Sequence, residues 1–287
     1  MNEATTKIGR DEHVWSFDAR REPVAIVDAG TVIEIETWDC FTGQVQSEED
    51  TLDKIDLSRV NSATAPIGVR GTEPGDSLSV TLLDIRPGVK GAAMCIPGWG
   101  QLIHQVHSPT TRIFQVSDGL VTMNDRVSFP ARPIFGAVGV SPESGEVSTF
   151  FAGRHGGNMD DQMNAIGSTV RLPVFQSDAQ LAIGDMPASM GDGEICGTGV
   201  EIGGTALIKV DVIKNKCAGW PITETADSFF THGTSRDNID DALQSACEEA
   251  SKLLVDEWGF SSEDAFMFLS VAGDLGLAAS FTLRRAA

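Results

Sequence analysis

Two short segments in the middle of this chain place acidic residues between glycines. Residues 155–161 read His-Gly-Gly-Asn-Met-Asp-Asp, and residues 191–201 read Gly-Asp-Gly-Glu-Ile-Cys-Gly-Thr-Gly-Val-Glu. Glycine tolerates positive φ and lets backbone amides approach a ligand, while carboxylates move protons or bind cations. The segments therefore indicate either a polar functional site or two turns with solvated carboxylates, since Gly and Asp also build ordinary turns.

Individual side chains near these segments suggest different roles. Asn158 and Asp160 are two residues apart, so both face one pocket if the segment is extended. His155 is compatible with a metal ligand and with a loop residue. Cys196 has no basic neighbour in the sequence that would lower its pKa, which favours a space-filling thiol over a nucleophile. We expect His232, which precedes the late helical pattern, to lie in a loop.

Asp39 and His13 are candidate ligands near the amino end. Residues 31–37 alternate as a half-buried strand, with Ile33 and Ile35 on one face. If this strand continues, Asp39 shares that face and points inward, where an unpaired carboxylate is strongly unfavourable. We therefore expect Asp39 to be a ligand or a hydrogen-bond anchor, with a buried cap at the strand end as the alternative. His13 is either a metal ligand or a packed or surface residue.

The pattern around these candidates predicts a β-rich body followed by helices. Short alternating apolar runs recur between Gly, Pro and Asp turn signals over the first two thirds of the chain. Apolar residues then follow three- and four-residue spacing from Ile239 to Trp258, with Gly259 where a helix commonly ends. A capping signal at residues 261–264 precedes a second helix, which Gly273 ends.

We accordingly expect an α+β, β-rich fold. It would combine a β-sandwich or barrel-like N-terminal part with a smaller C-terminal α/β part that carries two helices. We assign residues 1–145 to the first part and residues 146–287, which hold the glycine segments, to the second. No linker rich in Pro or Ser divides the chain, so we expect the two parts to be intertwined.

Charge and composition exclude several classes of partner. The 21 basic and 41 acidic residues give a formal net charge of −20, which repels the phosphates of nucleic acids and anionic membrane surfaces. Residues 1–12 are polar and no apolar run reaches the length of a membrane span, so we expect a cytoplasmic protein. The five cysteines are odd in number and lack a C-x-x-C pair, which argues against a disulfide framework or a thiolate zinc site and favours small core residues for most of them.

The order and spacing of the glycine segments resemble the acetamidase/formamidase family. The resemblance rests on residues 155–160, on Leu-Pro-Val at 172–174 and on the block at 191–201. Weaker matches in the expected order are His-Val-Trp at 13–15, Glu-Thr-Trp-Asp at 36–39, Gly-Thr-Glu-Pro-Gly-Asp at 71–76, Ile-Pro-Gly-Trp-Gly at 96–100, Phe-Gly-Ala-Val-Gly-Val at 135–140 and Ser-Val-Ala-Gly-Asp-Leu at 270–275. Together they span roughly residues 10 to 275.

The resemblance implies an enzyme that hydrolyses a small linear amide to a carboxylate and ammonia. It also implies assembly into a homo-oligomer and a bound divalent metal, for which zinc and calcium are the candidates. The absence of a Gly-x-Ser-x-Gly elbow and of a Ser-Ser-Lys signature leaves a serine mechanism without an obvious nucleophile. A water activated by the metal would then attack the amide carbonyl.

Roles follow for the residues of the matching segments. Glu194 is the candidate general base, because amide hydrolysis requires a group that takes a proton from water and returns one to the leaving nitrogen. Asp192 is its candidate catalytic partner. The expected metal ligands are Asp39, Asp160 and His13, and the expected substrate-binding residues are Asn158, Gly157 and Gly193.

One position departs from the family pattern. The family typically has a histidine after the Gly-Asp pair that precedes the second glycine segment, whereas this chain has Pro187 two residues after Asp185. Proline offers neither a ring nitrogen nor a backbone N–H. The histidine is thus dispensable, or the chain acts on another C–N bond or with another metal, or it is a binding protein without hydrolytic activity.

Overall fold

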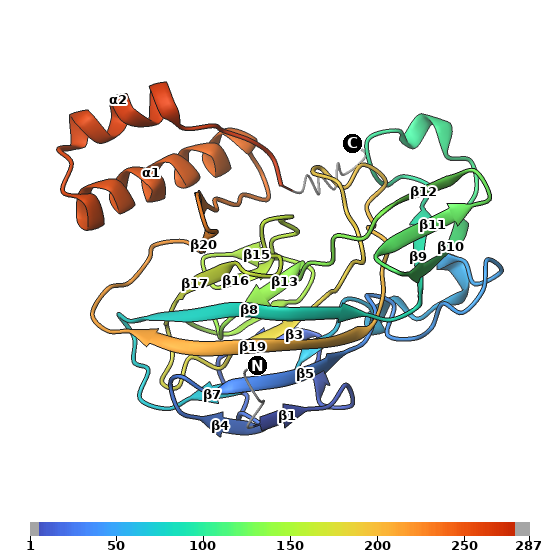
Figure 1. Cartoon of the computed structure of the whole chain (residues 1–287), viewed down its shortest axis with the longest axis horizontal. Helices are drawn as coiled ribbons and strands as arrows, with labels where there is room; N and C mark the ends of the chain where they lie inside the picture. Colours follow the sequence, from blue (N-terminus) through green and yellow to red (C-terminus); the bar gives the residue numbers. More distant parts are fainter. Residues whose placement is uncertain (1–5, 279–287) are drawn as a thin grey trace.

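A computed structural model describes residues 6–278, so the first five residues of the polar amino-terminal segment lie outside the described part. The molecule has a strand-rich body, a small sheet and a pair of helices. The small sheet and the helices lie on the same side of the long strands (Figure 1). Among the described residues, no helix combines the length and apolar character that crossing a membrane requires. The expected α+β, β-rich class with two late helices is confirmed.

The largest sheet has seven strands and draws on both halves of the chain. Its spatial order is β1 (Thr6–Ile8), β5 (Val32–Thr37), β19 (Gly204–Ile213), β8 (Ser77–Pro87), β17 (Thr169–Pro173), β20 (Ile222–Glu224) and β21 (Phe229–Thr231). Only the β1–β5 pair of this sheet is parallel, and the other pairs are antiparallel. Strands from the predicted N-terminal and C-terminal parts therefore share one hydrogen-bonded sheet.

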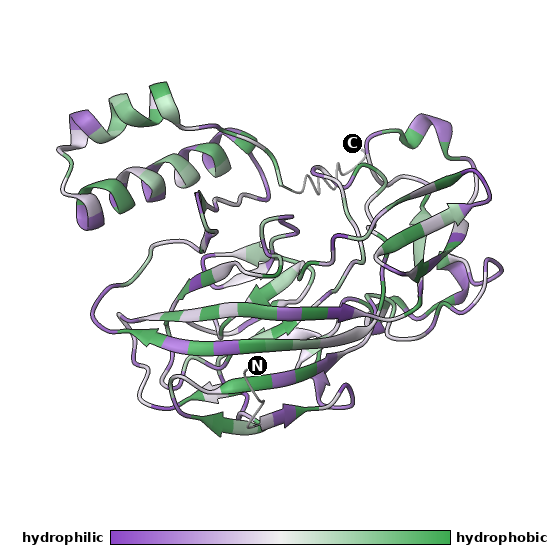
Figure 2. Cartoon of the chain, viewed as in Figure 1, coloured by the Kyte–Doolittle hydropathy of each residue, from purple (hydrophilic) through white to green (hydrophobic). Residues whose placement is uncertain are grey.

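Hydropathy along the long strands explains why this sheet forms the core. Ile33 and Ile35 of β5 are fully buried, whereas Glu34 between them is partly exposed. The same alternation runs along β8 and β19, as Figure 2 shows. Each strand thus has one apolar face, and burial of that face stabilises the sheet. A tight turn precedes β8, with Gly75 at φ 101° and the Asp76 N–H donating to the Glu73 carbonyl at 3.0 Å.

Smaller sheets surround this core. A six-stranded sheet has the order β15 (Ala152–Gly153), β16 (Gly156–Asn158), β13 (Ala137–Gly139), β18 (Ala182–Gly184), β6 (Ala63–Thr64) and β2 (His13–Val14). A four-stranded sheet has the order β12 (Val127–Pro130), β11 (Leu120–Asn124), β10 (Thr110–Ser117) and β9 (Lys90–Cys95). Two pairs complete the strands, β14 (Glu146–Ser148) with β3 (Ser16–Asp18) and β4 (Ala25–Val27) with β7 (Ile67–Val69). Short 3₁₀ helices cover Leu52–Lys54, Leu57–Arg59 and Ile103–Gln105.

The two predicted helices begin and end where the sequence signals place them. Helix α1 (Ile239–Trp258) is followed by Gly259 at φ 74°, the left-handed conformation that glycine favours. Helix α2 (Ser262–Ala272) is capped by the Ser261 hydroxyl, which accepts the Asp264 N–H at 3.1 Å.

Helix α1 is attached to the large sheet by a two-armed ion pair. The Arg171 guanidinium on β17 contacts Glu257 of α1 at 2.9 Å and Glu224 of β20 at 2.5 Å. Nearby, Leu253 of α1 packs against Ile222 in a small apolar cluster. The helical pair is therefore fixed to the end of the sheet that β20 and β21 form.

Candidate active site

The six-stranded sheet brings two aspartates of the glycine segments together. Strand β13 lies between β16 and β18, so Ala137 is opposite Asn158 on one side and Gly184 on the other. The chain therefore leaves both outer strands at the same end, at Asp160 and Asp185. Gly136 lies between these two, and a Cβ atom there would be 2.3 Å from Asp160 Oδ1 and 2.6 Å from Asp185 Oδ2. The missing side chain of Gly136 is what lets both carboxyl groups enter.

Two glutamates complete a buried acidic cluster, which we define as Asp160, Asp185, Glu194 and Glu201. Asp185 forms side-chain hydrogen bonds with Asp160 and Glu201 and also with the Cys40 thiol. Burial raises the pKa of Asp160 and Glu201 well above the ordinary carboxyl value, and the charge of Asp185 raises both further. Carboxyl groups this close share protons unless a cation is present.

Glu194 has a titration range suited to proton transfer. Burial, together with the nearby Asp185 charge, raises the pKa of Glu194 to about 8. A general base works best when its pKa lies near the working pH, so this environment suits a group that accepts and returns a proton. One carboxylate oxygen of Glu194, Oε2, is buried without a hydrogen-bond partner.

The backbone of the cluster is held in an uncommon conformation. Asp160, Asp185 and Glu194 have positive φ values of 46°, 53° and 39°. Non-glycine residues in the left-handed region are disfavoured and tend to gather at functional sites. Here the strain coincides with three of the four buried carboxyl groups.

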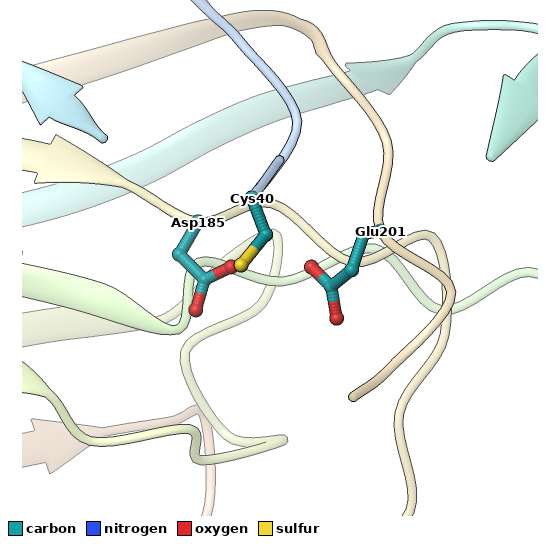
Figure 3. A group of neighbouring side chains, drawn as sticks. All are labelled: Cys40, Asp185 and Glu201. Carbon is teal, nitrogen blue, oxygen red and sulfur yellow. The ribbon is translucent and has the colours of Figure 1, made fainter. Parts of the chain in front are cut away.

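Cys40, Asp185 and Glu201 could hold a metal ion. One ligand atom from each of these side chains lies within 4.8 Å of the others (Figure 3). Burial, and then the negative charges of Asp185 and Glu201, raise the pKa of the Cys40 thiol. Glu201 Oε2 is buried without a hydrogen-bond partner, while its Oε1 accepts the Gly199 N–H at 2.6 Å. A thiol beside two carboxylates suits zinc, whereas calcium takes six or more oxygen ligands. The residues therefore fit a divalent cation, and the thiol favours zinc.

The predicted substrate-binding residues lie at the edge of the cluster. Asn158 Nδ2 donates to Asp160 Oδ2 at 2.5 Å, and Asn158 Oδ1 accepts from Asn61 at 2.9 Å. Gly157 has φ 91° and lies within β16. The Gly193 N–H donates to the Ala278 carbonyl at 2.5 Å. Asn158 is thus the predicted substrate-binding side chain that contacts the acidic cluster.

The other predicted residues occupy different surroundings. Strand β5 ends at Thr37, so Asp39 is placed by a turn, in which its carboxylate accepts the N–H groups of Phe41 and Gly43 at 2.8 and 3.1 Å. This is the cap arrangement that the sequence left open. His13 Nδ1 lies 2.8 Å from the Arg10 carbonyl. Asp192 is exposed.

His155 is buried against the ring of Phe17, with ring centroids 4.9 Å apart. Burial, and to a lesser degree the charge of Arg236, lowers the pKa of His155 to about 4.

A cavity of about 460 Å³ lies beside the cluster. Asp39 and Phe41 line it on either side of Cys40 in the sequence, and Glu201 lines it as well. The cavity therefore reaches the acidic cluster at Glu201. Basic side chains of Arg10, Arg86 and Lys90 also face this cavity.

Sequence reasoning gave no role to three residues that the fold brings together. In the sequence, Asp185 stands out only as the residue two positions before Pro187, Glu201 is part of a motif, and Cys40 is one of five cysteines. The expected core positions of the cysteines are corrected by their exposure, because Cys95 and Cys247 are exposed and the other three are half-buried. The signal for Asp185 was its place after a glycine at a strand end.

His232 lies in a loop between β21 and α1, as predicted, and it also forms a buried polar contact that the sequence did not indicate. Its Nε2 lies 2.7 Å from Asp161 Oδ2, and its Nδ1 lies 3.1 Å from the Pro221 carbonyl. Burial opposes ionisation of Asp161, but the hydrogen bond and charge of His232 outweigh it and lower the Asp161 pKa. Asp161 directly follows Asp160, so this pair fixes one end of the acidic cluster to the segment that precedes α1.

Comparison with known proteins identifies the class to which this site belongs. A formamidase of Methylophilus methylotrophus is 27% identical over an alignment 353 positions long, which covers 93% of this chain and 86% of the relative. An acetamidase from Bacillus halodurans superposes with a TM-score of 0.90 and 34% identity, covering 95% of this chain and 94% of that one. A predicted acetamidase/formamidase from Thermoanaerobacter tengcongensis superposes with a TM-score of 0.89 and 35% identity. This match covers 93% of this chain and 88% of that one.

The family model itself matches two spans, residues 14–150 and 144–276. The chain therefore belongs to the acetamidase/formamidase family, as the motifs indicated. It is an amidase that acts on carbon–nitrogen bonds other than peptide bonds. A gamma lactamase from Delftia acidovorans has a TM-score of 0.71 at 24% identity, covering 93% of this chain and 83% of that one, and this likeness shows the fold alone.

We predict that the Asp161–His232 pair stabilises the fold and positions Asp160. Replacing His232 by Ala leaves a buried carboxylate without its partner, which should lower the free energy of unfolding by about 3 kcal/mol. Urea unfolding of both single variants and the double variant Asp161→Ala/His232→Ala should give a coupling energy of about 1–3 kcal/mol. The exposed His107 provides the matched control, and His107→Ala should cost about 0.5 kcal/mol or less. Additive effects of the two substitutions would contradict the pairing.

Proposed function

We propose that this protein hydrolyses small linear amides of the formamide and acetamide type, releasing a carboxylate and ammonia. The observation that carries the proposal is the buried cluster of Asp160, Asp185, Glu194 and Glu201, two of which have an unpartnered carboxylate oxygen. The names of the relatives support the substrate class. The partner is thus a small-molecule amide, and nothing in the charge of the chain favours nucleic acid or a membrane surface.

Glu194 is the proposed general base. It would accept a proton from the attacking water and return one to the leaving nitrogen, which needs a group that is readily protonated and deprotonated near neutral pH. The raised pKa of about 8 supports this role. Asp192, exposed in the same loop, remains a proposed catalytic partner that could act only if substrate binding brings the loop closer.

Cys40, Asp185 and Glu201 are the proposed ligands of a divalent cation, preferentially zinc. When bound, such a cation would supply Lewis-acid activation of the amide carbonyl and of a water molecule. Asp160, which contacts Asp185, remains a candidate ligand of the cation. Asp39 and His13, the other two ligands expected from the sequence, remain candidates as well. The ligand atoms of Cys40, Asp185 and Glu201 lie within 4.8 Å of one another, which favours these three residues as the ligands.

Asn158, Gly157 and Gly193 are the proposed contacts to the amide substrate. Asn158 carries both a donor and an acceptor on its side chain, which matches the donor and acceptor of an amide. Backbone amides near the two glycines are candidates for stabilising the oxyanion, since N–H groups aimed at a developing negative charge lower the barrier. The Gly193 N–H itself already donates to the Ala278 carbonyl, so it would have to exchange that partner for the substrate. The neighbouring cavity of about 460 Å³ supports a small substrate.

We also propose that the protein is a cytoplasmic homo-oligomer. Exposed apolar side chains on α2 support assembly, because Phe266 is 77% and Val271 83% exposed. Burial of this face in a contact between copies would remove apolar surface from water.

A second candidate function follows from Pro187, which lies outside the named strands and pairs with Glu201 through an isolated bridge. A protein that kept this fold without the family's histidine could act on a different C–N bond or bind an amide without hydrolysing it.

We predict that Glu194→Gln lowers turnover by about 10²–10⁴-fold, because glutamine cannot accept the proton. Ammonia release from formamide and acetamide at saturating substrate measures it. Glu263→Gln, an exposed substitution on α2, serves as the matched control and should leave turnover unchanged. Wild-type turnover in the Glu194 variant would rule out its role as base.

We predict about one divalent cation for each chain, and its loss should lower turnover. Elemental analysis of the purified protein, before and after exhaustive chelation, measures the cation. Cys40→Ser and Asp185→Asn should reduce the metal content, whereas Cys247→Ser on the exposed face of α1 should retain it. Full activity after complete chelation would refute metal activation.

We predict that ammonia release from a panel of short amides distinguishes the two candidate functions. An amidase that has dispensed with the histidine should release ammonia with Pro187 in place, and Pro187→His should not raise turnover. Hydrolysis that appears only in the Pro187→His variant would favour the binding protein.

A further inference from the structure

Two thiols far apart in the sequence meet at the loop that carries Glu194. Cys95 is the last residue of β9, and Cys196 lies in the second glycine segment. Burial raises the pKa of the Cys95 thiol, and the adjacent Cys196 thiol raises it further. Cys95 is exposed and Cys196 is half-buried, so a small molecule in solution can reach the pair. The Cys196 Sγ also lies 3.5 Å from the Thr198 carbonyl, which orients the thiol.

Backbone contacts on both sides hold these two segments together. The Met94 N–H donates to Thr198 Oγ1 at 3.0 Å, and the Gln101 N–H donates to the Ile195 carbonyl at 2.8 Å. A Cβ on Gly100 would lie 2.9 Å from Cys196 Cα, so the chains approach as closely as glycine allows. The two thiols are therefore neighbours because the backbone is fixed around them, and not through a chance meeting of mobile side chains.

We propose that Cys95 and Cys196 are a redox-active pair that closes to a disulfide and thereby restrains the Glu194 loop. In this step the two thiols lose two protons and two electrons as the S–S bond forms. An oxidant of the azo class accepts both, and its N=N bond becomes an HN–NH bond. Exposed Cys95 meets the reagent first, and its sulfur is then attacked by the Cys196 sulfur.

Closure of the disulfide would affect Glu194, because Glu194 and Cys196 are close in the sequence. Glu194 precedes Cys196 by two residues and has the strained φ of 39°. A disulfide constrains its two Cα atoms to about 4.4–6.8 Å and fixes the torsion about the sulfurs, so closure limits the conformations open to the loop. A displacement of about 1 Å at a group that moves protons can reduce turnover by about 10²-fold. This consequence for turnover rests on the proposed function, whereas disulfide formation does not.

The experiment treats the full-length protein with diamide, an azo oxidant, and then with dithiothreitol. Peptide mapping under non-reducing conditions should show a cross-link between the peptides that contain Cys95 and Cys196, with a mass lower by two hydrogen atoms. Ammonia release should fall by about tenfold or more on oxidation and recover on reduction. Cys95→Ser and Cys196→Ser should abolish both the cross-link and the loss of activity.

Cys247→Ser is the matched control, because Cys247 is exposed on α1 and should not affect cross-linking or its reversal. Absence of the Cys95–Cys196 cross-link in the folded protein overturns the proposal, as does a cross-link that leaves amide turnover unchanged. If the reduced protein hydrolyses no amide, the proposed function fails separately. In that case, the restraint would still be supported if oxidation cross-links the pair and makes the Glu194 loop more resistant to proteolysis. This added resistance should be absent in Cys196→Ser.

Discussion

The structure depends on keeping four carboxyl groups together in a place with little water. Asp160, Asp185, Glu194 and Glu201 would repel one another if all were ionised, and burial makes each charge costly. Shared protons or a cation are the two ways to relieve this cost. The missing side chain of Gly136 leaves the space in which the carboxyl groups of Asp160 and Asp185 meet.

Local patterns in the sequence predicted the elements, because those patterns depend on near neighbours. The alternation around Ile33 and the spacing between Ile239 and Trp258 identify a strand and a helix without reference to the rest of the chain. The cluster is different, because it depends on which strands become neighbours. Asp160 and Asp185 meet only because β13 pairs with both β16 and β18, and no local spacing encodes that pairing. Cys40 enters the site in the same way, from a turn after β5.

The prediction for Asp39 shows where local reasoning reaches its limit. Parity along a strand identifies a face only while the strand continues, and β5 ends at Thr37. Beyond that point the turn sets the direction of each side chain, so Asp39 caps backbone N–H groups while its neighbour Cys40 points to Asp185 and Glu201. His232 lies in a loop, as predicted, but its contact with Asp161 could not be predicted because the two residues are distant in sequence.

Pro187 is tolerated because of where it lies in the backbone pairing. The bridge between Pro187 and Glu201 is closed by the N–H groups of the neighbours, with Ala188 donating to Val200 at 2.8 Å and Ile202 donating to Met186 at 3.0 Å. The N–H that proline lacks is therefore not needed in this bridge, and Glu201 keeps its backbone position. Pro187 supplies no ring nitrogen where the family resemblance leads one to expect a histidine, and we propose that the carboxyl groups and the Cys40 thiol supply the chemistry of this site.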